Sequence, residues 1–417
     1  MSILIKNVRL GDEYRDLLLA DGRISKISPR IDEPAEETIE GEGNLAIPPF
    51  VNGHTHAAMA LLRGYADDLP LDEWLNTRIW PVEARLTEDD VYWGTRLACN
   101  EMIRSGTTMF NDMYWHYHGV ARAVQDAGIR AAVSAVFIDL FSDAKAAEQV
   151  TLNERLLEES GQYGPRVRFT LGPHAIYTVS EKSLRWIRDF AEEHGLLVHI
   201  HLSETREEVA ECLKRYEARP VEYLDRIGFL GPNVIAAHVI WVNEPELDIL
   251  RERGVKVVYN PTSNMKLASG IFPYHQLNNA DVSILLGTDG CASNNNLDMF
   301  EEMKFASLLQ KISQENPSIL DAHEVYGLAG RNGAAAFGLD YEVLKVGNPA
   351  DLILIDLEDI HLVPDHQTVP NLVYSASGSC VHTTICDGKI LMRDRQVAGE
   401  EEVIVRAREV AARLTRS

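Results

Sequence analysis

The stretch PPFVNGHTHAAMALLRG, residues 48–64, places His54 and His56 two positions apart directly after an apolar run. In a β-strand, side chains at i and i+2 point to the same face of the sheet. Two imidazoles on one face, at the end of a strand, are placed to hold one metal ion. Two ordinary polar residues in a loop are the alternative, so the rest of the chain has to decide.

Seven further strand-like runs follow this one and alternate with amphipathic segments. They are TTMFND (107–112), RAAVSAVF (130–137), RVRFTLGP (166–173), LLVHIHL (196–202), NVIAAHV (233–239), VKVVYNP (255–261) and VSILLGTDG (282–290). Eight βα units predict a (β/α)8 barrel, with a doubly wound open sheet as the alternative. A helical segment over 313–338 is expected to close the barrel.

Two of the helices are predicted by the residues at their ends. In LTEDDVYWGTRLACNEMIRSGTT, Thr87 is the expected N-cap, Asp90 stands at N3 and Gly106 follows the last turn. In SEKSLRWIRDFAEEHG, Ser180 leads the helix and Gly195 closes it.

The two ends of the chain resemble each other. DLLLADGRISKI and TTICDGKILM each place Asp-Gly between apolar runs, which is a strong signal for a β-hairpin. VGNPADLILID adds a further strand before the second hairpin. We therefore expect residues 1–48 and 346–417 to form one small composite β-sandwich domain, beside a catalytic barrel over 49–345.

Composition excludes several classes of protein. The 417 residues carry a net charge of −23, which argues against a nucleic-acid backbone or an anionic membrane as the partner. Five cysteines without a C-x-x-C pair argue against a disulfide framework or a zinc-thiolate site. The chain shows no signal-peptide pattern and no apolar run long enough to span a membrane. We expect a cytoplasmic protein.

Four of the eight predicted strands end in residue types that bind metals or move protons. These residues are His54 and His56, then His201 and Glu204, then His238, and finally Asp289. Because the strand ends of a (β/α)8 barrel meet at its carboxyl-terminal face, they are expected to converge on one site. GTDG taken alone is also compatible with an Asx-turn. His199, two residues before His201, is interpreted as a core or supporting residue.

Three neutral imidazoles and a carboxylate suit one divalent cation, Zn²⁺ in the first place and Fe²⁺ as the alternative. Such an ion lowers the pKa of bound water to about 7 and so supplies hydroxide at neutral pH. Glu204 lies three residues after His201 and is free to move a proton. His238 is placed to orient the hydroxide, and Asp289 to bind the metal and accept the hydroxide proton.

At this point VNGHTHAAMALLRG, HIHLSET, AAHVIWV and GTDGCASNNNLDMFEEMK resemble the amidohydrolase superfamily. More narrowly, they resemble its 5′-methylthioadenosine/S-adenosylhomocysteine deaminases, which include 5′-deoxyadenosine deaminases. The resemblance covers nearly the whole chain and implies a barrel with a composite β-sandwich and one divalent metal ion. It implies Glu204 as proton shuttle, His238 as the residue that positions water, and a set of metal ligands formed by His54, His56, His201 and Asp289.

The resemblance also implies where a substrate binds. Two-metal members of the superfamily carry a lysine at the end of strand four, whereas RVRFTLGPHAIYT has His174 there and no lysine, which favours a single metal. It places His174 in contact with substrate, with a polar loop residue as the alternative. In LPLDEWLNTRIWPVEARL it places Glu83 on the ribose hydroxyls and Trp74 near the 5′ side, with a plain amphipathic helix as the alternative.

The reaction implied is hydrolytic deamination of an adenine nucleoside at C6, giving the inosine analogue and ammonia. A metal-bound hydroxide attacks, and Glu204 passes its proton to N1 of the ring. FIDLFSDAKAAEQ after strand three holds no arginine, and the next one is Arg155. This favours methylthioadenosine, 5′-deoxyadenosine or adenosine over S-adenosylhomocysteine, unless an arginine arrives from elsewhere or from a neighbouring subunit.

Other functions remain open at this stage. A guanine deaminase and a triazine-type amidohydrolase would share the same metal site. A non-catalytic scaffold would have lost at least one ligand, and a nucleoside sensor would not need to generate hydroxide. We expect a homo-oligomer acting on a small-molecule nucleoside, and the role of Cys291 is left open.

Overall fold

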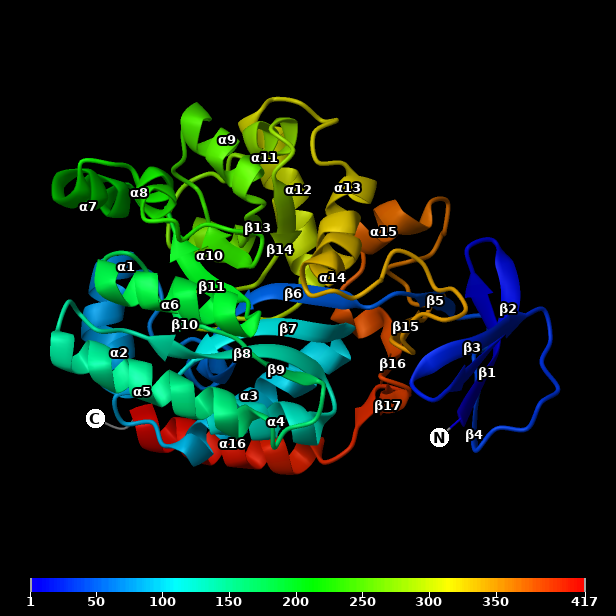
Figure 1. Ribbon diagram of the computed structural model, residues 1–417. Coiled ribbons are helices and arrows are strands. Elements are labelled where there is room, and N and C mark those ends of the chain that lie inside the picture. The colour runs from blue at the N-terminus through cyan, green and yellow to red at the C-terminus, as the bar shows by residue number, and fades with distance from the viewer. Residues whose placement is uncertain (1, 416–417) are drawn as a thin grey trace.

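A closed barrel of parallel strands forms the centre of the computed structural model, which describes residues 2–415 apart from the side chain of Asp72 (Figure 1). Its strands are β6 (Phe50–Thr55), β7 (Thr107–Tyr114), β8 (Arg130–Phe137), β9 (Val167–Phe169), β10 (Gly172–Pro173), β11 (Val198–Leu202), β12 (Val234–His238), β13 (Lys256–Tyr259) and β14 (Ser283–Leu286). The fourth predicted strand is divided into β9 and β10, and Leu171 between them bridges to Val198 of β11.

The barrel closes where the end of β14 meets β6. The backbone N–H of Asp289 donates to the carbonyl oxygen of His54 at 2.9 Å. The predicted (β/α)8 barrel is thus confirmed, and the open doubly wound alternative is wrong.

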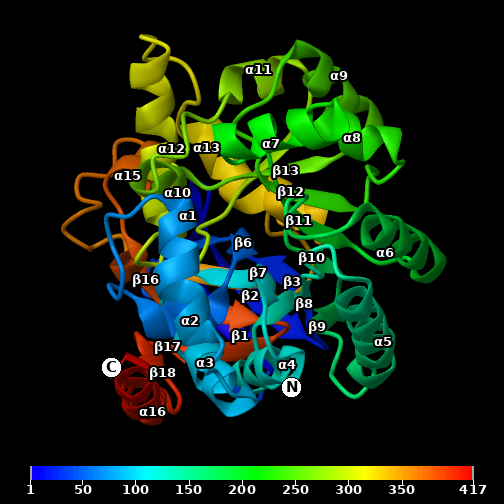
Figure 2. The ribbon, with the colours of Figure 1, turned by 90° about the vertical axis from the view of Figure 1, so that its left-hand side faces the viewer.

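Helices surround the barrel strands on the outside (Figure 2). They are α3 (Glu88–Arg104), α4 (Tyr117–Ala127), α5 (Asp143–Ser160), α6 (Glu181–His194), α7 (Arg206–Tyr216), α8 (Pro220–Arg226), α9 (Glu244–Arg253), α10 (Pro261–Lys266), α11 (Tyr274–Asn279), α12 (Met299–Ser313), α13 (Ala322–Gly327) and α14 (Gly333–Ala336). Shorter helical turns are η1 (Ala57–Leu62), α1 (Leu71–Trp74), η2 (Leu75–Ile79), α2 (Trp80–Glu83), η3 (Leu328–Asn332) and η4 (Gly378–Cys380).

The predicted helix ends are confirmed. Thr87 and Asp90 form a reciprocal capping box at the start of α3, and Ser180 caps α6, which ends at the left-handed Gly195. Of the segment predicted as helical over 313–338, Ser313 ends α12, and the next helix begins only at Ala322 with α13. Pro317 accounts for the delay, because proline disfavours helical geometry at the residue before it.

Both ends of the chain contribute to one sheet of nine strands, seen at the right of Figure 1. From the N-terminal part come β1 (Ser2–Leu10), β2 (Glu13–Ala20), β3 (Arg23–Ser28), β4 (Glu37–Glu40) and β5 (Leu45–Ile47). From the C-terminal part come β15 (Leu352–Ile355), β16 (Val381–Cys386), β17 (Lys389–Arg393) and β18 (Gln396–Val397). The antiparallel pairing of β5 with β15 joins the two contributions.

The two Asp-Gly turns form as predicted. Asp21 and Gly22 have φ of 52° and 70°, and Asp387 and Gly388 have φ of 55° and 68°. Two consecutive left-handed residues define the turn that matches the twist of a two-residue hairpin. The two turns pack against each other, since a Cβ on Gly388 would lie 3.3 Å from the Cα of Gly22.

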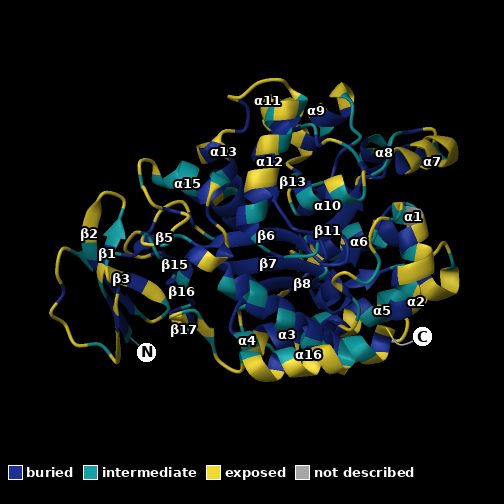
Figure 3. Ribbon diagram, turned by 180° about the vertical axis from the view of Figure 1, so that it is seen from behind, coloured by how far each residue is buried: buried dark blue, intermediate teal, exposed yellow. Residues whose placement is uncertain are grey.

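The final part of the chain leaves the sheet. α15 (Thr368–Tyr374) packs on α12 and α13, and α16 (Glu400–Thr415) packs along α3. Figure 3 shows the barrel strands buried, α15 half-buried and the outer face of α16 exposed. No helix within residues 2–415 is long and apolar enough to cross a membrane.

Ion pairs centred on Arg130 link the barrel to the sheet. Arg130, at the start of β8, donates to the carboxylates of Asp351 at 2.9 Å and Asp387 at 3.0 Å. The Asp351 side chain is fully buried and also accepts the hydroxyl of Tyr341. A buried carboxylate needs such partners, because an unpaired charge away from water is strongly unfavourable.

We predict that Arg130→Met lowers the free energy of unfolding by about 3 kcal/mol, because it leaves Asp351 buried without its cation. The matched control is Arg122→Met, whose pair with Glu88 is exposed on both sides and should contribute less than about 1 kcal/mol. Urea unfolding followed by circular dichroism measures both changes. Equal midpoints for the two variants would contradict the prediction.

Candidate active site

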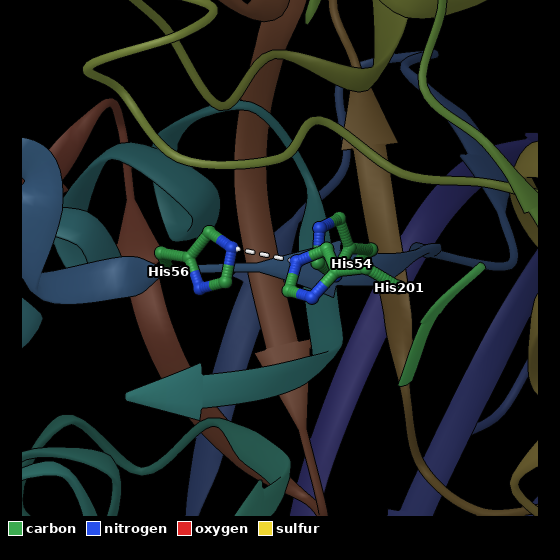
Figure 4. Close-up of side chains that lie close together, drawn as sticks. All are labelled: His54, His56 and His201. Atoms are coloured by element: carbon green, nitrogen blue, oxygen red, sulfur yellow. Dashed lines mark hydrogen bonds between the residues drawn. The ribbon is translucent and has the colours of Figure 1, made fainter. Parts of the chain in front are cut away.

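Three imidazoles meet at the carboxyl-terminal end of the barrel (Figure 4). His54 and His56 come from the end of β6, and His201 comes from β11. The Nε2 atoms of His56 and His201 lie 3.2 Å apart, and one ring nitrogen from each of the three residues falls within 4.8 Å of the others. The i, i+2 spacing on β6 therefore turns both side chains toward one point.

Hydrogen bonds at Nδ1 determine which nitrogen carries the proton in His56 and His201. His56 Nδ1 lies 2.6 Å from the carbonyl oxygen of Met113, and His201 Nδ1 lies 2.7 Å from that of His174. A carbonyl oxygen only accepts hydrogen bonds, so Nδ1 carries the proton in each ring. In the form in which both rings are neutral, each Nε2 carries a lone pair and the two lone pairs face each other. A cation between them removes this conflict, so these residues fit a metal ion.

His54 is held in a different way. Its Nδ1 lies 2.8 Å from Nε2 of His199, and its own Nε2 faces the other imidazoles. Burial lowers the pKa of His54 to about 4, so the ring is neutral at pH 7 and has the protonation state that a metal ligand requires. The interpretation of His199 as a supporting residue agrees with this contact.

Asp289 faces the histidines from the end of β14. Its Oδ1 lies 3.4 Å from Nε2 of both His54 and His56, which is longer than a usual hydrogen bond and leaves room for an ion. Its Oδ2 accepts the hydroxyl of Ser263 at 2.6 Å. Burial acts to raise the pKa of Asp289, but His54 and His56 outweigh it and hold the pKa well below its usual range. The group is therefore an anion.

Glu204 and His238 lie beside this cluster and contact each other. His238 Nε2 is 3.7 Å from Glu204 Oε2, and its Nδ1 is 2.9 Å from Asn264 Oδ1. The other oxygen of Glu204 accepts the hydroxyl of Ser269 at 3.1 Å. Burial raises the pKa of Glu204, which makes its carboxylate a better proton acceptor than an exposed one.

The backbone turns sharply where these side chains leave their strands. Ser203 after β11, His238 at the end of β12 and Asp289 after β14 have φ of 51°, 73° and 65°. Left-handed geometry costs a non-glycine residue about 1–2 kcal/mol. Three such residues at the ends of β11, β12 and β14 indicate that the surrounding packing maintains strain at this site.

A cavity opens above the cluster and is lined by the remaining candidates. Glu83, at the end of α2, is buried and accepts the indole N–H of Trp115 at 3.1 Å. Trp74 ends α1 and donates its indole N–H to the carbonyl oxygen of Ala66 at 2.9 Å. His174 follows β10, with Nδ1 2.9 Å from the hydroxyl of Thr178. Burial lowers the pKa of His174 to about 3.

The structure brings all of the sequence-predicted residues together. Eight of them line the cavity, namely His56, Trp74, Glu83, His174, His201, Glu204, His238 and Asp289, and His54 lies beside them in the histidine cluster. Their chemical roles stay predictions. Cys291 is buried in the hydrophobic core and contributes to packing.

Sequence reasoning missed the residues that hold these groups. Ser263, Asn264 and Ser269 lie in and after α10, which follows β13, a strand to which no candidate was assigned. The polar run NPTSN at that strand end was the available signal. Trp115 follows β7 directly, and its position at a strand end was the corresponding signal.

Comparison with known proteins agrees with this geometry. The amidohydrolase family model matches residues 45–391, and the chain belongs to this family.

Several relatives are similar over almost their full length. The chain is 50% identical to a 5′-deoxyadenosine deaminase of Methanoregula boonei, covering 100% of this chain and 96% of the relative. It is 46% identical to a 5-methylthioadenosine/S-adenosylhomocysteine deaminase of Thermococcus sibiricus, covering 94% of each. A crystal structure of an adenosine deaminase from Xanthomonas campestris with bound zinc superimposes with a TM-score of 0.91 at 34% identity, covering 99% of this chain and 98% of that one.

Proposed function

We propose that this protein deaminates adenine nucleosides hydrolytically at C6, producing the inosine analogue and ammonia. The observation that carries the proposal is the position of Glu204, next to both His238 and the histidine–aspartate cluster in one buried cavity. The deaminases to which the chain is 46–50% identical support the same reaction class.

We propose that His54, His56, His201 and Asp289 together hold one divalent cation, with Zn²⁺ as the first candidate and Fe²⁺ as the second. Three neutral imidazoles and one carboxylate form a donor set that suits either ion. The zinc in the adenosine deaminase from X. campestris supports the first choice. When bound, the cation acts as a Lewis acid and makes water nucleophilic at neutral pH.

The remaining side chains account for the proton transfers. Glu204 takes a proton from the attacking water and delivers it to N1 of the purine, so that C6 becomes tetrahedral. His238 holds the water's oxygen in line with C6. Asp289 accepts the second proton and passes it to the amino group, which leaves as ammonia. Water has then been added and ammonia expelled, so that atoms and protons balance.

The remaining residues that line the cavity bind the nucleoside. Glu83 accepts hydrogen bonds from the ribose hydroxyls, and the indole N–H of Trp115 keeps its carboxylate oriented. His174 contacts the substrate from the opposite wall, and Trp74 packs near the 5′ position. Trp115 is thereby added to the residues expected at this site, as the group that orients Glu83.

The 5′ group of the substrate is proposed to be uncharged. Among the described residues that line the cavity there is no lysine or arginine, and the wall includes Leu71, Leu75, Val136 and Ile138. A homocysteine carboxylate in such surroundings would be buried without a cation. We therefore propose 5′-deoxyadenosine, methylthioadenosine and adenosine as substrates.

We also propose the division of the chain into a composite β-sandwich domain over residues 1–48 and 346–417, from which α15 and α16 pack back on the barrel helices, and a catalytic barrel over residues 49–345. The pairing of β5 with β15 supports it.

The first prediction tests turnover. Zinc-loaded protein should deaminate 5′-deoxyadenosine, detected by the ultraviolet change and by ammonia release. Glu204→Gln should lower kcat by about 10²–10⁴-fold, because it removes the proton carrier. The control is Glu207→Gln, an exposed neighbour on α7. If the metal-loaded protein turns over no adenine nucleoside, the proposed function is wrong.

The second prediction concerns the metal. The wild-type protein should retain about one zinc ion per chain after dialysis, as a single four-ligand site requires. His201→Ala and Asp289→Asn should each lose most of it, because each removes a proposed ligand. Mass spectrometry of the metal content measures the loss, and His194→Ala, exposed at the end of α6, serves as control. Full zinc retention in both variants would refute the ligand assignment.

The third prediction ranks substrates. 5′-Deoxyadenosine should exceed S-adenosylhomocysteine in kcat/KM by at least about tenfold, because the charged tail finds no cation in the cavity. Initial rates over a range of concentrations give both constants. A comparable or higher kcat/KM for S-adenosylhomocysteine would show that a cation reaches the 5′ side from elsewhere.

A further inference from the structure

The start of α7 differs from the capping boxes that begin several other helices. In a capping box, the carboxylate at N3 accepts the backbone N–H of the N-cap residue, as happens in α3, α9 and α13. In α7 the N-cap is Thr205, and its hydroxyl accepts the N–H of Glu208 at 3.1 Å. The Glu208 carboxylate, however, reaches past Thr205. It accepts the N–H of Ser203 and the N–H of Glu204, both at 2.8 Å.

The two amides held by Glu208 belong to the segment that carries Glu204. Ser203 has a left-handed φ of 51°, a strained conformation that needs support. Its carbonyl oxygen accepts the N–H groups of Ile240 and Trp241, both at 3.0 Å. These residues directly follow the turn at His238. The buried Glu208 carboxylate thus holds the backbone N–H of Glu204 directly. Through Ser203, it is also connected by hydrogen bonds to the residues that follow His238.

A carboxylate that only capped the helix would not need to extend to the N–H groups of Ser203 and Glu204. The N-cap amide of Thr205 is closer along the chain and is the ordinary partner of an N3 carboxylate. Two hydrogen bonds from consecutive amides to one side chain instead restrict the peptide between Ser203 and Glu204 in two places. The direction of the Glu204 side chain follows from that peptide.

We propose that Glu208 is a positioning residue, which holds the Glu204 carboxylate in line with the nucleoside and its attacking water by clamping the amides of Ser203 and Glu204. The proposal rests on the proposed function, because Glu208 acts on the reaction only through Glu204.

The test is Glu208→Asp. Aspartate keeps a carboxyl group at the start of α7 and can accept the Thr205 N–H, but it is one methylene too short to reach Ser203 and Glu204. We expect kcat for 5′-deoxyadenosine to fall by about 10–100-fold, as for a misplacement of about 1 Å. KM should stay within about threefold, because substrate contacts are untouched. Zinc content and melting temperature should stay close to those of the wild-type protein.

The matched control is Glu324→Asp, which makes the same change at N3 of α13, where the carboxylate forms an ordinary capping box with Asp321. Its kcat should equal that of the wild-type protein. A fall in kcat as large as that of Glu208→Asp would show a general effect of helix capping and overturn the proposal.

A double-mutant cycle separates positioning from an independent role. In a Glu204→Gln background, Glu208→Asp should lower the residual kcat by less than about twofold, because the group being positioned is already absent. A full multiplicative loss would overturn the proposal.

The remaining outcomes are also decisive. Unchanged kcat in a folded, zinc-loaded Glu208→Asp protein overturns the proposal. So does loss of folding or of zinc in both Glu208→Asp and Glu208→Gln, since Glu208 would then be structural. Absence of turnover by the wild-type protein would instead refute the proposed function, which keeps the two failures distinct.

Discussion

Two lone pairs that face each other across 3.2 Å are the constraint on which the rest of the site depends. Nδ1 of His56 and Nδ1 of His201 donate to the carbonyl oxygens of Met113 and His174, so when both rings are neutral each Nε2 carries a lone pair. The barrel therefore builds a point of negative potential and buries it. Asp289 adds an anion to the same point. A cation at this point, either a metal ion or a proton shared by the two rings, relieves the repulsion, and the donor set fits the proposed metal.

The barrel strands bring these side chains to one end of the barrel, and the turns that follow the strands set the directions of the side chains. Ser203, His238 and Asp289 each adopt left-handed backbone geometry at a strand end. Hydrogen bonds from neighbouring segments hold each turn in place: Glu208 holds Ser203, Asn264 holds the ring of His238, and Ser263 holds the carboxylate of Asp289. The site thus combines rigid strand ends with locally strained turns, a combination suited to fixing a proton carrier beside a reacting atom.

The sheet formed by the two chain ends is connected to the barrel by ion pairs and by helix packing. Arg130 begins a barrel strand and forms ion pairs with Asp351 and Asp387 beside the nine-stranded sheet, and Arg166 forms a second ion pair with Asp387. The C-terminal helix α16 packs along α3, a helix of the barrel. Residues far apart in sequence thereby hold β8 and α3, and the barrel depends on the ends of the chain for part of its stability.

Local chemistry in the sequence determined the eight strands, the Asp-Gly hairpins, the caps of α3 and α6, and the residues that end β6, β11, β12 and β14. Each of these depends on neighbours within a few positions, such as side-chain alternation in a strand or left-handed geometry at Asp-Gly. Only the tertiary structure decided that Trp115 meets Glu83, that Ser269 meets Glu204, and that α16 covers α3. The reach of Glu208 past its own N-cap belongs to this second group. These contacts depend on the direction in which separate segments approach one another, and barrel closure sets that direction, whereas sequence spacing does not.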